Sequence, residues 1–393
     1  METRFDVVIA GGGALGSACA YFLTQTPEFR GSILVVEPDP SYREAASTRS
    51  ASSIRLQFST PINITLSMFG MEFLRDAPRR LARGSMAADV GLVESSYLYL
   101  ATPQGRSTLE QRVAIQRAWS APAMLHDRPD LAARYPWLNT EDLAAGCDTV
   151  RGEGWFDGHS LLTALRAANE RAGVRYVRDR AAGFLRAADG AVACVQLESQ
   201  GEVRCRFAVN AAGTRARELA ATAGVDLPVY ARKRHVFVFT CPVAIPRCPL
   251  VIDPTGLWFR PEGDRFLCGP VSDPDPNVAP DDFEVDYALF ERSAWPVLAH
   301  RVPAFESVRM SSAWAGHYDY NAFDQNAFAG PVPSIPNLLL ANGFSGHGLQ
   351  QAPGIGRGLA EYICFGGYRS IDLSPLSYAR YTAGVPLREL NVI

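Results

Sequence analysis

The chain lacks long hydrophobic runs and a leader segment at its start. None of its apolar stretches approaches the ~20 residues that a membrane-spanning helix needs. The first apolar run, residues 7–10, is short and leads into glycines rather than into a signal-peptide cleavage site. The sequence therefore predicts a cytoplasmic protein without an integral membrane segment, and it leaves a peripheral membrane contact open.

An excess of charge of one sign is also absent. The formal net charge is −3 and charged residues make up 20% of the chain, so nothing favours a nucleic-acid partner. The densest basic run, Arg232 to Arg234, opens a strand-like segment. A solvated strand edge is the simpler interpretation of that run, and a substrate-facing role is the alternative.

Closely paired cysteines and metal-ligand spacings are missing as well. The eight cysteines contain no Cys-x-x-Cys pair, and several fall in apolar runs, where a free thiol behaves as a small hydrophobic side chain. A loop between Cys241 and Cys248 would allow these two to meet, although their spacing does not require it. The six histidines show no ligand pattern. These features indicate a reduced protein without a disulfide framework and without a metal site.

A glycine-rich motif follows the first strand-like run. Gly11, Gly13 and Gly16 have the spacing Gly-x-Gly-x-x-Gly, with Ala14 and Leu15 between the last two, and a second apolar run ends at Glu37. In this pattern the glycines permit a tight turn, a close approach of the backbone to a pyrophosphate, and close packing of the helix on the sheet. An acid about twenty residues later accepts hydrogen bonds from ribose hydroxyls. The pattern predicts a dinucleotide-binding βαβ unit.

Two later segments are predicted to complete the same sheet, and at 393 residues the chain is long enough for two domains. A helix over 160–172 precedes a parallel strand at 174–177, a β-meander runs to about residue 210, and a buried strand over 337–342 precedes a C-terminal helix ending near residue 365. We therefore expect an α/β (α+β) fold with a discontinuous Rossmann-like domain and an inserted antiparallel-sheet domain. The expected boundaries are 1–84, 152–222 and 326–393 for the first domain, and 85–151 and 223–325 for the second. Other expected elements are helices over 64–74 and 108–119, a strand over 94–100, and loops over 241–254 and 273–282.

A second glycine-rich turn, Gly343 to Gln351, helps to identify the dinucleotide. A nicotinamide enzyme has no evident use for this turn or for the hydroxyl-rich loop between Ser47 and Ser53, whereas a flavin enzyme uses both. A reduced flavin gathers negative charge at one edge of its ring, and the free N–H groups of a helix N-terminus stabilise such charge. FAD is therefore favoured, and a nicotinamide dehydrogenase is the alternative that a colourless purified protein would support.

Together these motifs resemble the D-amino-acid oxidase/sarcosine oxidase (DAO) family of FAD-dependent oxidoreductases over nearly the whole chain. The matching pieces are Gly11–Gly16 with Glu37, the Ser47–Arg55 loop, Asn210–Gly213 and Gly343–Gly348. Segments 232–238 and 316–326 are similar to a subgroup of FAD-dependent oxidoreductase-domain proteins that includes a mitochondrial protein linked to complex I assembly and its bacterial relatives.

The resemblance implies that FAD lies between the two domains. It implies that hydroxyl and guanidinium groups of the first loop wrap the pyrophosphate and flavin, and that the backbone at Ala181 meets adenine. The implied loop residues are Ser47, Thr48, Arg49, Ser50, Ser52 and Ser53. Further implied cofactor residues are Ala212, Gly213, Gly343, Gly346, His347, Gly348, Leu349 and Gln350, those from Gly346 onward along the flavin pyrimidine edge. A simple turn role is the alternative for His347.

The resemblance also implies oxidation of the C–N bond of an amino acid or N-alkyl amino acid. Our hypothesis is a hydride transfer from the α-carbon to flavin N5, which gives an imine. Arg55, assisted by Gln350, is the candidate anchor for a substrate carboxylate; a surface or pyrophosphate-bound arginine is the alternative. The remaining catalytic candidates are His317, Trp258 and Tyr318. A core histidine is the simpler interpretation of His317, whereas Trp258 and Tyr318 are expected to line the cavity, with core positions between the domains as the alternative.

Two departures from the family pattern refine these expectations. Sarcosine oxidases attach FAD through a cysteine where this chain has His317, so the resemblance implies noncovalent FAD. They also hold a lysine over the flavin where this chain has Leu267, which favours a dehydrogenase over an oxidase. The alternative function is a flavin-bearing assembly or electron-transfer subunit of a larger dehydrogenase complex. The substrate and the electron acceptor stay open.

Overall fold

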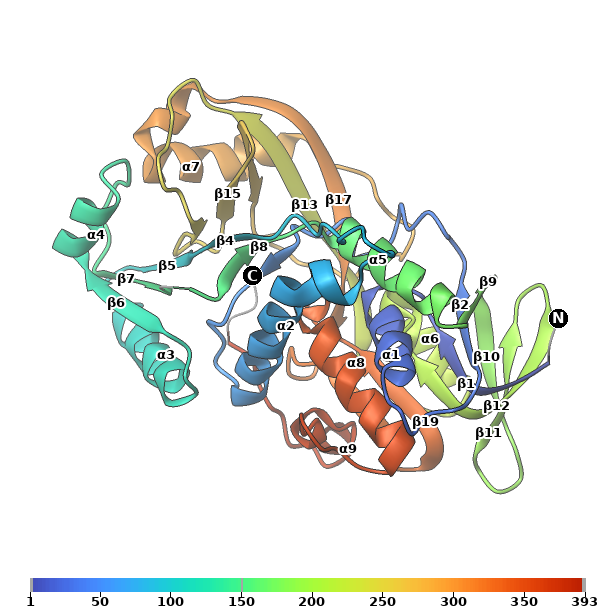
Figure 1. Ribbon diagram of the computed structural model, residues 1–393. Helices are drawn as coiled ribbons and strands as arrows, with labels where there is room; N and C mark the ends of the chain where they lie inside the picture. Colours follow the sequence, from blue (N-terminus) through green and yellow to red (C-terminus); the bar gives the residue numbers. More distant parts are fainter. Residues whose placement is uncertain (1–2, 150, 391–393) are drawn as a thin grey trace.

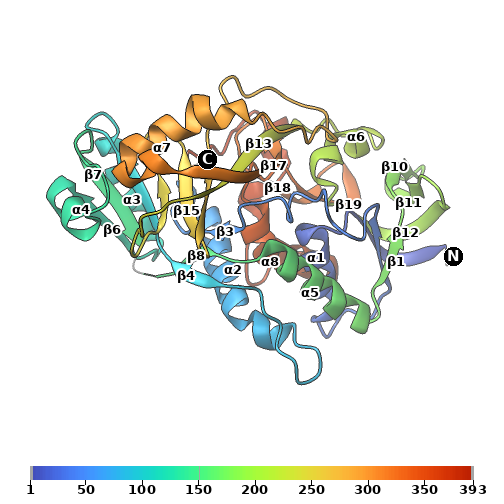
Figure 2. The same cartoon turned by 90° about the horizontal axis from the view of Figure 1, so that it is seen from above.

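The computed structural model describes residues 3–149 and 151–390, whose strands form two eight-stranded sheets and one three-stranded sheet. The two large sheets lie toward opposite ends of the molecule (Figure 1). One is accompanied by α1, α5 and α8, the other by α3, α4 and α7. Seen from above, the long strands β13 and β17, which belong to the second sheet, extend toward the first sheet (Figure 2).

The first large sheet has the strand order β10-β11-β12-β1-β2-β9, and β19 joins it beside β12. Residues Val7 to Ala10 of β1 are fully buried, as in a parallel strand with both faces covered. Strands β12, β1, β2, β9 and β19 are mutually parallel, and β10, β11 and β18 pair antiparallel. The bounds are β1 (Arg4–Ala10), β2 (Ile33–Glu37), β9 (Arg175–Arg178), β10 (Ala181–Arg186), β11 (Val192–Leu197), β12 (Gly201–Asn210), β18 (Phe328–Val332) and β19 (Ile335–Asn342).

Helices α1 (Ala14–Thr24) and α8 (Gly348–Phe365) pack side by side on this sheet, although they come from opposite ends of the chain (Figure 1). A glycine permits the close contact of the two helices, because a Cβ on Gly356 would lie 2.6 Å from the carbonyl carbon of Ala18. At the start of α1, a Cβ on Gly16 would lie 1.9 Å from the Gly11 oxygen of the preceding turn. Helix α5 (Gly158–Arg171) packs against α1, and α2 (Pro61–Arg80) against α8.

The second large sheet has the order β17-β13-β16-β15-β14-β5-β7-β6 and is antiparallel except for the parallel pair β14–β5. Its core is aromatic, with Phe237, Phe239, Phe259 and Phe305 fully buried. The bounds are β5 (Tyr97–Ala101), β6 (Ala123–Asp127), β7 (Ala145–Thr149), β13 (Val229–Thr240), β14 (Leu250–Ile252), β15 (Trp258–Glu262), β16 (Arg265–Gly269) and β17 (Arg309–Asn321). The flanking helices are α3 (Arg106–Ala118), α4 (Arg128–Arg134) and α7 (Trp295–Arg301).

A small sheet of β3 (Ser53–Ile54), β8 (Glu153–Trp155) and β4 (Val93–Ser95) connects segments from both predicted domains. The remaining elements are short. They are α6 (Ala216–Ala221), α9 (Ala379–Thr382), 3-10 turns at Gly213–Arg215, Pro303–Ser307 and Ser374–Leu376, and a π-turn at Phe290–Ala294.

The structure confirms the expected fold class, including the parallel strand β9 and the β10-β11-β12 meander. Two expected elements are wrong in detail. The strand predicted over 94–100 is interrupted at Ser96, because the chain there passes from the small sheet to the second large one. The predicted loop over 241–254 contains β14, which is held by its partner β5.

The predicted domain boundaries remain a proposal. The strands of each large sheet come from residues that the prediction assigns to a single domain. Residues 1–2, 150 and 391–393, at or near several of these boundaries, lie outside the described residues. Cys241 and Cys248 are both free thiols, so they do not pair across their loop. No helix in the described part of the chain has the length and apolar character needed to cross a membrane.

Candidate active site

One large cavity, with a volume of ≈ 980 Å³, is lined by residues of both large sheets and of the loop between β2 and β3. This volume lies at the upper end of the usual range for small-molecule sites. Most of the residues predicted from the sequence line it. They are Gly11, Gly13, Ala14, Leu15, Glu37, Ser47, Arg49, Ser50, Ser53, Arg55, Ala181, Ala212, Gly213, Trp258, His317, Tyr318, Gly346, His347, Gly348, Leu349 and Gln350.

Four predicted cofactor residues are not at the cavity wall: Gly16, Thr48, Ser52 and Gly343. Gly16 lies at the contact of α1 with β1. The Thr48 hydroxyl lies 3.4 Å from His159 Nδ1, and Ser52 Oγ accepts a hydrogen bond from the Gly158 N–H at 3.3 Å. These residues shape the backbone around the cavity, so we expect no direct ligand contact from the Thr48 and Ser52 side chains.

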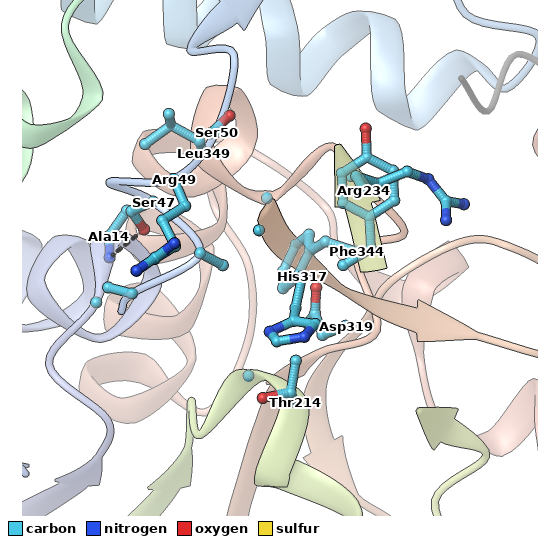
Figure 3. Close-up of a pocket in the computed structure, with 18 of the residues that line it drawn as sticks. Ala14, Ser47, Arg49, Ser50, Thr214, Arg234, His317, Asp319, Phe344 and Leu349 are labelled. Atoms are coloured by element: carbon cyan, nitrogen blue, oxygen red, sulfur yellow. Dashed lines mark hydrogen bonds between the residues drawn. The ribbon is translucent and has the colours of Figure 1, made fainter. Parts of the chain in front are cut away.

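Two helix N-termini border the cavity. In helices α1 and α8, both fully described, the N-cap residues, Gly13 and His347, make no side-chain capping hydrogen bond, and no acid lies in the first turn. Their first turns line the cavity, and Ser47 Oγ accepts from the Ala14 N–H at 3.2 Å, which fixes the β2–β3 loop beside α1 (Figure 3). N–H groups at helix starts carry partial positive charge. The cavity is therefore suited to a ligand with negative charge at two separate places.

Glu37 is held beside the glycine turn. Its two carboxylate oxygens accept from the backbone N–H groups of Gly12 and Asp39, each at 2.9 Å. Burial raises the pKa of this carboxyl group, and the two N–H donors oppose that rise. A Cβ on Gly12 would lie 2.9 Å from the Glu37 Cβ, so only glycine lets the acid take this position. A carboxylate fixed here fits the ribose hydroxyls of a dinucleotide.

Arg55 is a buried cation at the cavity wall, with 3% of its surface exposed. Its Nη1 donates to the Tyr99 hydroxyl at 2.7 Å, and its Nη2 donates to His347 Nε2 at 2.9 Å. The guanidinium also lies over the Phe58 ring at 4.4 Å. The Gln350 side chain accepts the Arg55 backbone N–H at 2.8 Å, so Gln350 orients the arginine.

The chain after Arg55 is fixed by Glu153 of β8, a fully buried carboxylate. Its Oε1 accepts from the backbone N–H groups of Leu56 (2.7 Å) and Gln57 (3.2 Å), and its Oε2 accepts from Tyr97 N–H (3.1 Å) and the Thr149 hydroxyl (2.6 Å). Burial raises the pKa of Glu153, and these donors oppose the rise. This acid ties the arginine segment to β5 and β7 of the other sheet.

His317 and Asp319, both on β17, lie on the cavity wall near Phe344 (Figure 3). His317 Nε2 donates to the Asp282 carbonyl at 2.9 Å, and burial lowers the pKa of the imidazole, which is therefore neutral. Asp319 Oδ2 accepts from the Gly343 N–H at 2.7 Å, and burial raises the pKa of this carboxyl group to about 6. Sequence reasoning missed Asp319. Strand alternation was the available signal, because residues two apart share a face.

The loop before α7 reaches the cavity from the second sheet. The Phe283 ring lies 4.4 Å from the Arg49 guanidinium and 4.5 Å from the His317 ring. Asp275, Asp281 and Phe283 line the cavity together with Arg49. This loop spans residues 270–286, and the sequence predicted only a loop over 273–282, since no local pattern ties the segment to the glycine motif.

The basic run Arg232–Arg234 holds this loop, so its interpretation as a solvated strand edge is wrong. Arg232 and Arg234 both pair with Asp275, at 2.9 and 2.7 Å, and Lys233 pairs with Asp282 at 2.8 Å. Burial alone would raise the pKa of Asp275, but the two arginines outweigh it and hold that pKa below its usual value. Arg234 also lines the cavity, so the alternative prediction, that this basic run faces the substrate, stays open.

These features fit FAD. Two helix starts without an acid in the first turn suit its pyrophosphate and the negative edge of its reduced ring. Glu37 suits a ribose, and the cavity is large enough for an extended ligand. The described residues contain no group of three or more His, Cys, Asp or Glu side chains that could hold a metal ion.

Comparison with known proteins agrees with this assignment. Residues 6–362 match the family described as DAO, FAD dependent oxidoreductase. The chain is 38% identical over 427 residues to FAD-dependent oxidoreductase domain-containing protein 1 of Xenopus laevis, covering 99% of this chain and 85% of that protein.

Two solved structures share the fold. They are L-proline dehydrogenase from P. horikoshii (TM-score 0.85, 21% identity, 98% of this chain and 99% of that chain) and glycine oxidase from Geobacillus kaustophilus (TM-score 0.81, 24% identity, 95% and 98%). The predicted resemblance and cofactor are confirmed, and the chain belongs to the DAO family of FAD-dependent oxidoreductases.

Proposed function

We propose that this protein oxidises the C–N bond of an amino acid or N-alkyl amino acid. The observation that carries the proposal is the buried guanidinium of Arg55 at the wall of the FAD cavity. A substrate carboxylate is the natural partner for a planar cation in such a place. FAD, when bound, would supply the acceptor for the hydride, which carries the electron pair of the broken C–H bond away from the substrate α-carbon.

The protein's own groups position the substrate. Arg55 binds the carboxylate, while Tyr99, His347 and Gln350 keep the guanidinium and its backbone in place. Trp258 and Tyr318 form walls of the same cavity and limit how the rest of the substrate lies. Because these contacts exist before the substrate arrives, fixed orientation and the helix-terminal N–H groups account for most of the rate.

Relatives of the same fold support an amino-acid substrate. Two of them are named for L-proline and glycine, and proline is itself an N-alkyl amino acid. Leu267 supports a dehydrogenase rather than an oxidase, because it packs with Val236, Val238 and Trp258 in a purely apolar cluster. No cation is contributed at the position where the sarcosine oxidases carry a lysine.

Anaerobic mixing with a panel of primary and secondary amino acids tests the proposal. At least one should bleach the flavin absorption, and the reduced protein should react slowly with oxygen but rapidly with a quinone or a dye. If no member of the panel reduces the flavin, the substrate class is wrong. If oxygen reoxidises it as fast as a dye does, the dehydrogenase assignment is wrong.

The second candidate, a flavin-bearing assembly or electron-transfer subunit, is favoured by the names of its relatives. The Xenopus protein, similar over nearly the whole chain, is named for its domain and for no substrate. Stable flavin that no amino acid reduces, together with copurification of a respiratory or heteromeric dehydrogenase subunit, would support this candidate. The partner subunit and the compartment stay predictions.

A further inference from the structure

Residues 385–390, here called the strap, reach the wall of the FAD cavity at Leu390. Leu390 lines that cavity, yet 58% of its surface is exposed. A bound ligand can cover the exposed apolar surface of a leucine at the wall of its cavity. Each Å² of apolar surface removed from water stabilises the complex by ~25 cal/mol. The strap was not singled out in the sequence, because nothing in its local pattern relates it to the glycine motifs.

Glu389 pins the strap to the start of α2. Its carboxylate accepts from the Ser59 N–H (2.8 Å) and hydroxyl (2.6 Å), the Thr60 N–H (3.1 Å) and hydroxyl, and Asn63 Nδ2 (3.0 Å). The residue is fully buried. Burial would raise its pKa, but these donors outweigh burial and hold the pKa below its usual value, so Glu389 is ionised.

This pin lies next to the proposed carboxylate anchor. Ser59 directly follows Phe58, whose ring lies 4.4 Å from the Arg55 guanidinium and 4.9 Å from the His347 ring. A displacement of Glu389 would therefore move Ser59 and the adjacent Phe58, whose ring contacts Arg55 and His347.

The other side of the strap is held by two further groups. Arg112 of α3 donates from Nη2 to the Leu390 carbonyl at 3.3 Å. The Leu387 N–H donates to Asp324 at 3.0 Å, and its carbonyl accepts from Asn326 at 2.8 Å. The strap thus bridges α3, which flanks the second sheet, and the start of α2, which packs beside the first.

We propose that Leu390 is a specificity-determining residue that contacts the apolar part of a carboxylate substrate, and that Glu389 is the positioning residue that keeps it there. The inference rests on the proposed function and narrows it to substrates with a carboxylate at one end and an apolar substituent at the other. The same cavity is lined by Tyr97, Leu250, Ile252 and Trp258, a surface of matching character.

Binding of unreactive carboxylic acids tests the role of Leu390 without requiring turnover. Acetate, butyrate, hexanoate and benzoate are titrated into the holoprotein, and perturbation of the flavin spectrum reports the Kd. Affinity should rise with the length of the apolar tail in the unaltered protein. Leu390→Ala should raise the Kd for hexanoate and benzoate about tenfold and the Kd for acetate less than twofold.

Val385→Ala is the matched control, because Val385 is an apolar strap residue with 62% exposure that does not line the cavity. Its Kd values should equal those of the unaltered protein. The proposal is overturned if affinity does not depend on tail length, or if Leu390→Ala preserves that dependence. Neither result depends on whether any amino acid reduces the flavin, so failure of the proposed function is seen separately.

Glu389 is tested by Glu389→Ala and Glu389→Gln, with the exposed neighbour Arg388→Ala as control. Glu389→Ala should raise the Kd for hexanoate and benzoate about tenfold, because it releases Leu390, and should raise the Kd for acetate by less, at unchanged FAD content. Glu389→Gln should recover part of the loss. If the Kd for acetate rises as much as the Kd for hexanoate, if FAD content falls, or if affinity does not change, Glu389 is not the positioning residue for Leu390.

Discussion

At the scale of single residues, the site combines a buried cation with buried acids that serve other purposes. Arg55 is surrounded by a hydroxyl, an imidazole and an aromatic face. Glu153 and Glu389 have their carboxylates filled by backbone and hydroxyl donors. The two acids therefore fix the chain around Arg55, and its guanidinium lies at the wall of the cavity.

Replacing Arg55 should weaken substrate binding while FAD stays bound. A bidentate ion pair with a carboxylate contributes about 2–3 kcal/mol, so Arg55→Ala should raise KM roughly 30- to 150-fold. Arg55→Lys keeps the charge but loses the planar pair of donors, and should recover only a small part. Steady-state kinetics and the flavin-to-protein absorbance ratio measure the two effects. Unchanged KM would exclude the anchoring role.

Asp319 should make stability depend on pH. Its folded-state pKa of about 6 lies above the ordinary value, so its stabilising contribution is complete below the ordinary pKa and is lost as pH rises through about 6. Asp319→Asn cannot ionise. Relative to this variant, the unaltered protein should lose roughly 2–3 kcal/mol of unfolding free energy between pH 4 and pH 7. Urea denaturation of both proteins at the two pH values measures this, and parallel behaviour would contradict it.

At the scale of elements, the turn into α8 depends on backbone conformations that favour glycine. Gly343 and Gly346 have φ values of +73° and +95°, and between them Ser345 has φ 52°. This turn puts the start of α8 at the cavity, while Gly343 donates to Asp319. The turn and the strand β17 thus form one unit.

Gly346→Ala should reduce FAD affinity about tenfold or more. A Cβ there would lie 2.6 Å from the Tyr318 ring, so the ring or the turn must move. The matched control is Gly366→Ala at the other end of α8, where φ is +72° and nothing lies within 4 Å. That variant carries the same backbone strain, about 1 kcal/mol. FAD content after dialysis should fall only for Gly346→Ala; an equal fall in both would point to strain alone.

Local patterns explain which elements were predictable. The βαβ unit, β9 and α8 have strong periodicity and glycine signals within a few residues, and they lie where expected. β14 was missed because three residues in a proline-rich stretch carry little local signal, and its partner β5 lies far away in the chain. The break at Ser96 likewise reflects a change of sheet that no local pattern records.

The same distinction holds in the site. Glycines, loop hydroxyls and Arg55 were found because motifs contain them. Asp275, Glu153 and the strap were not, because their positions follow from packing between distant segments.

At the scale of the whole molecule, the cavity lies where both large sheets contribute walls, and the loop 270–286 covers it from the second sheet. Ion pairs of Asp275 with Arg232 and Arg234 hold that loop. These pairs are partly buried, so salt weakens them less than it weakens surface pairs, but breaking them leaves two arginines without their partner.

Asp275→Ala should release the loop and increase the rate of FAD dissociation about tenfold. The control is Asp286→Ala in the same loop region, which removes an exposed pair with Arg292 and a hydrogen bond from the Ala288 N–H. Recovery of flavin fluorescence on dilution into excess apo-scavenger measures the rate. High salt should accelerate release from the unaltered protein and from Asp286→Ala, and should add little in Asp275→Ala. Equal rates in all three proteins would show that the loop does not retain FAD.

The side-by-side packing of α1 and α8 has a consequence for biosynthesis. At ~5–20 residues per second, a ribosome releases these helices on the order of tens of seconds apart. During that interval the nascent βαβ unit has no partner for the small-residue face around Ala18, which α8 later covers at Gly356. We therefore expect flavin to be loaded only after α8 has been synthesised.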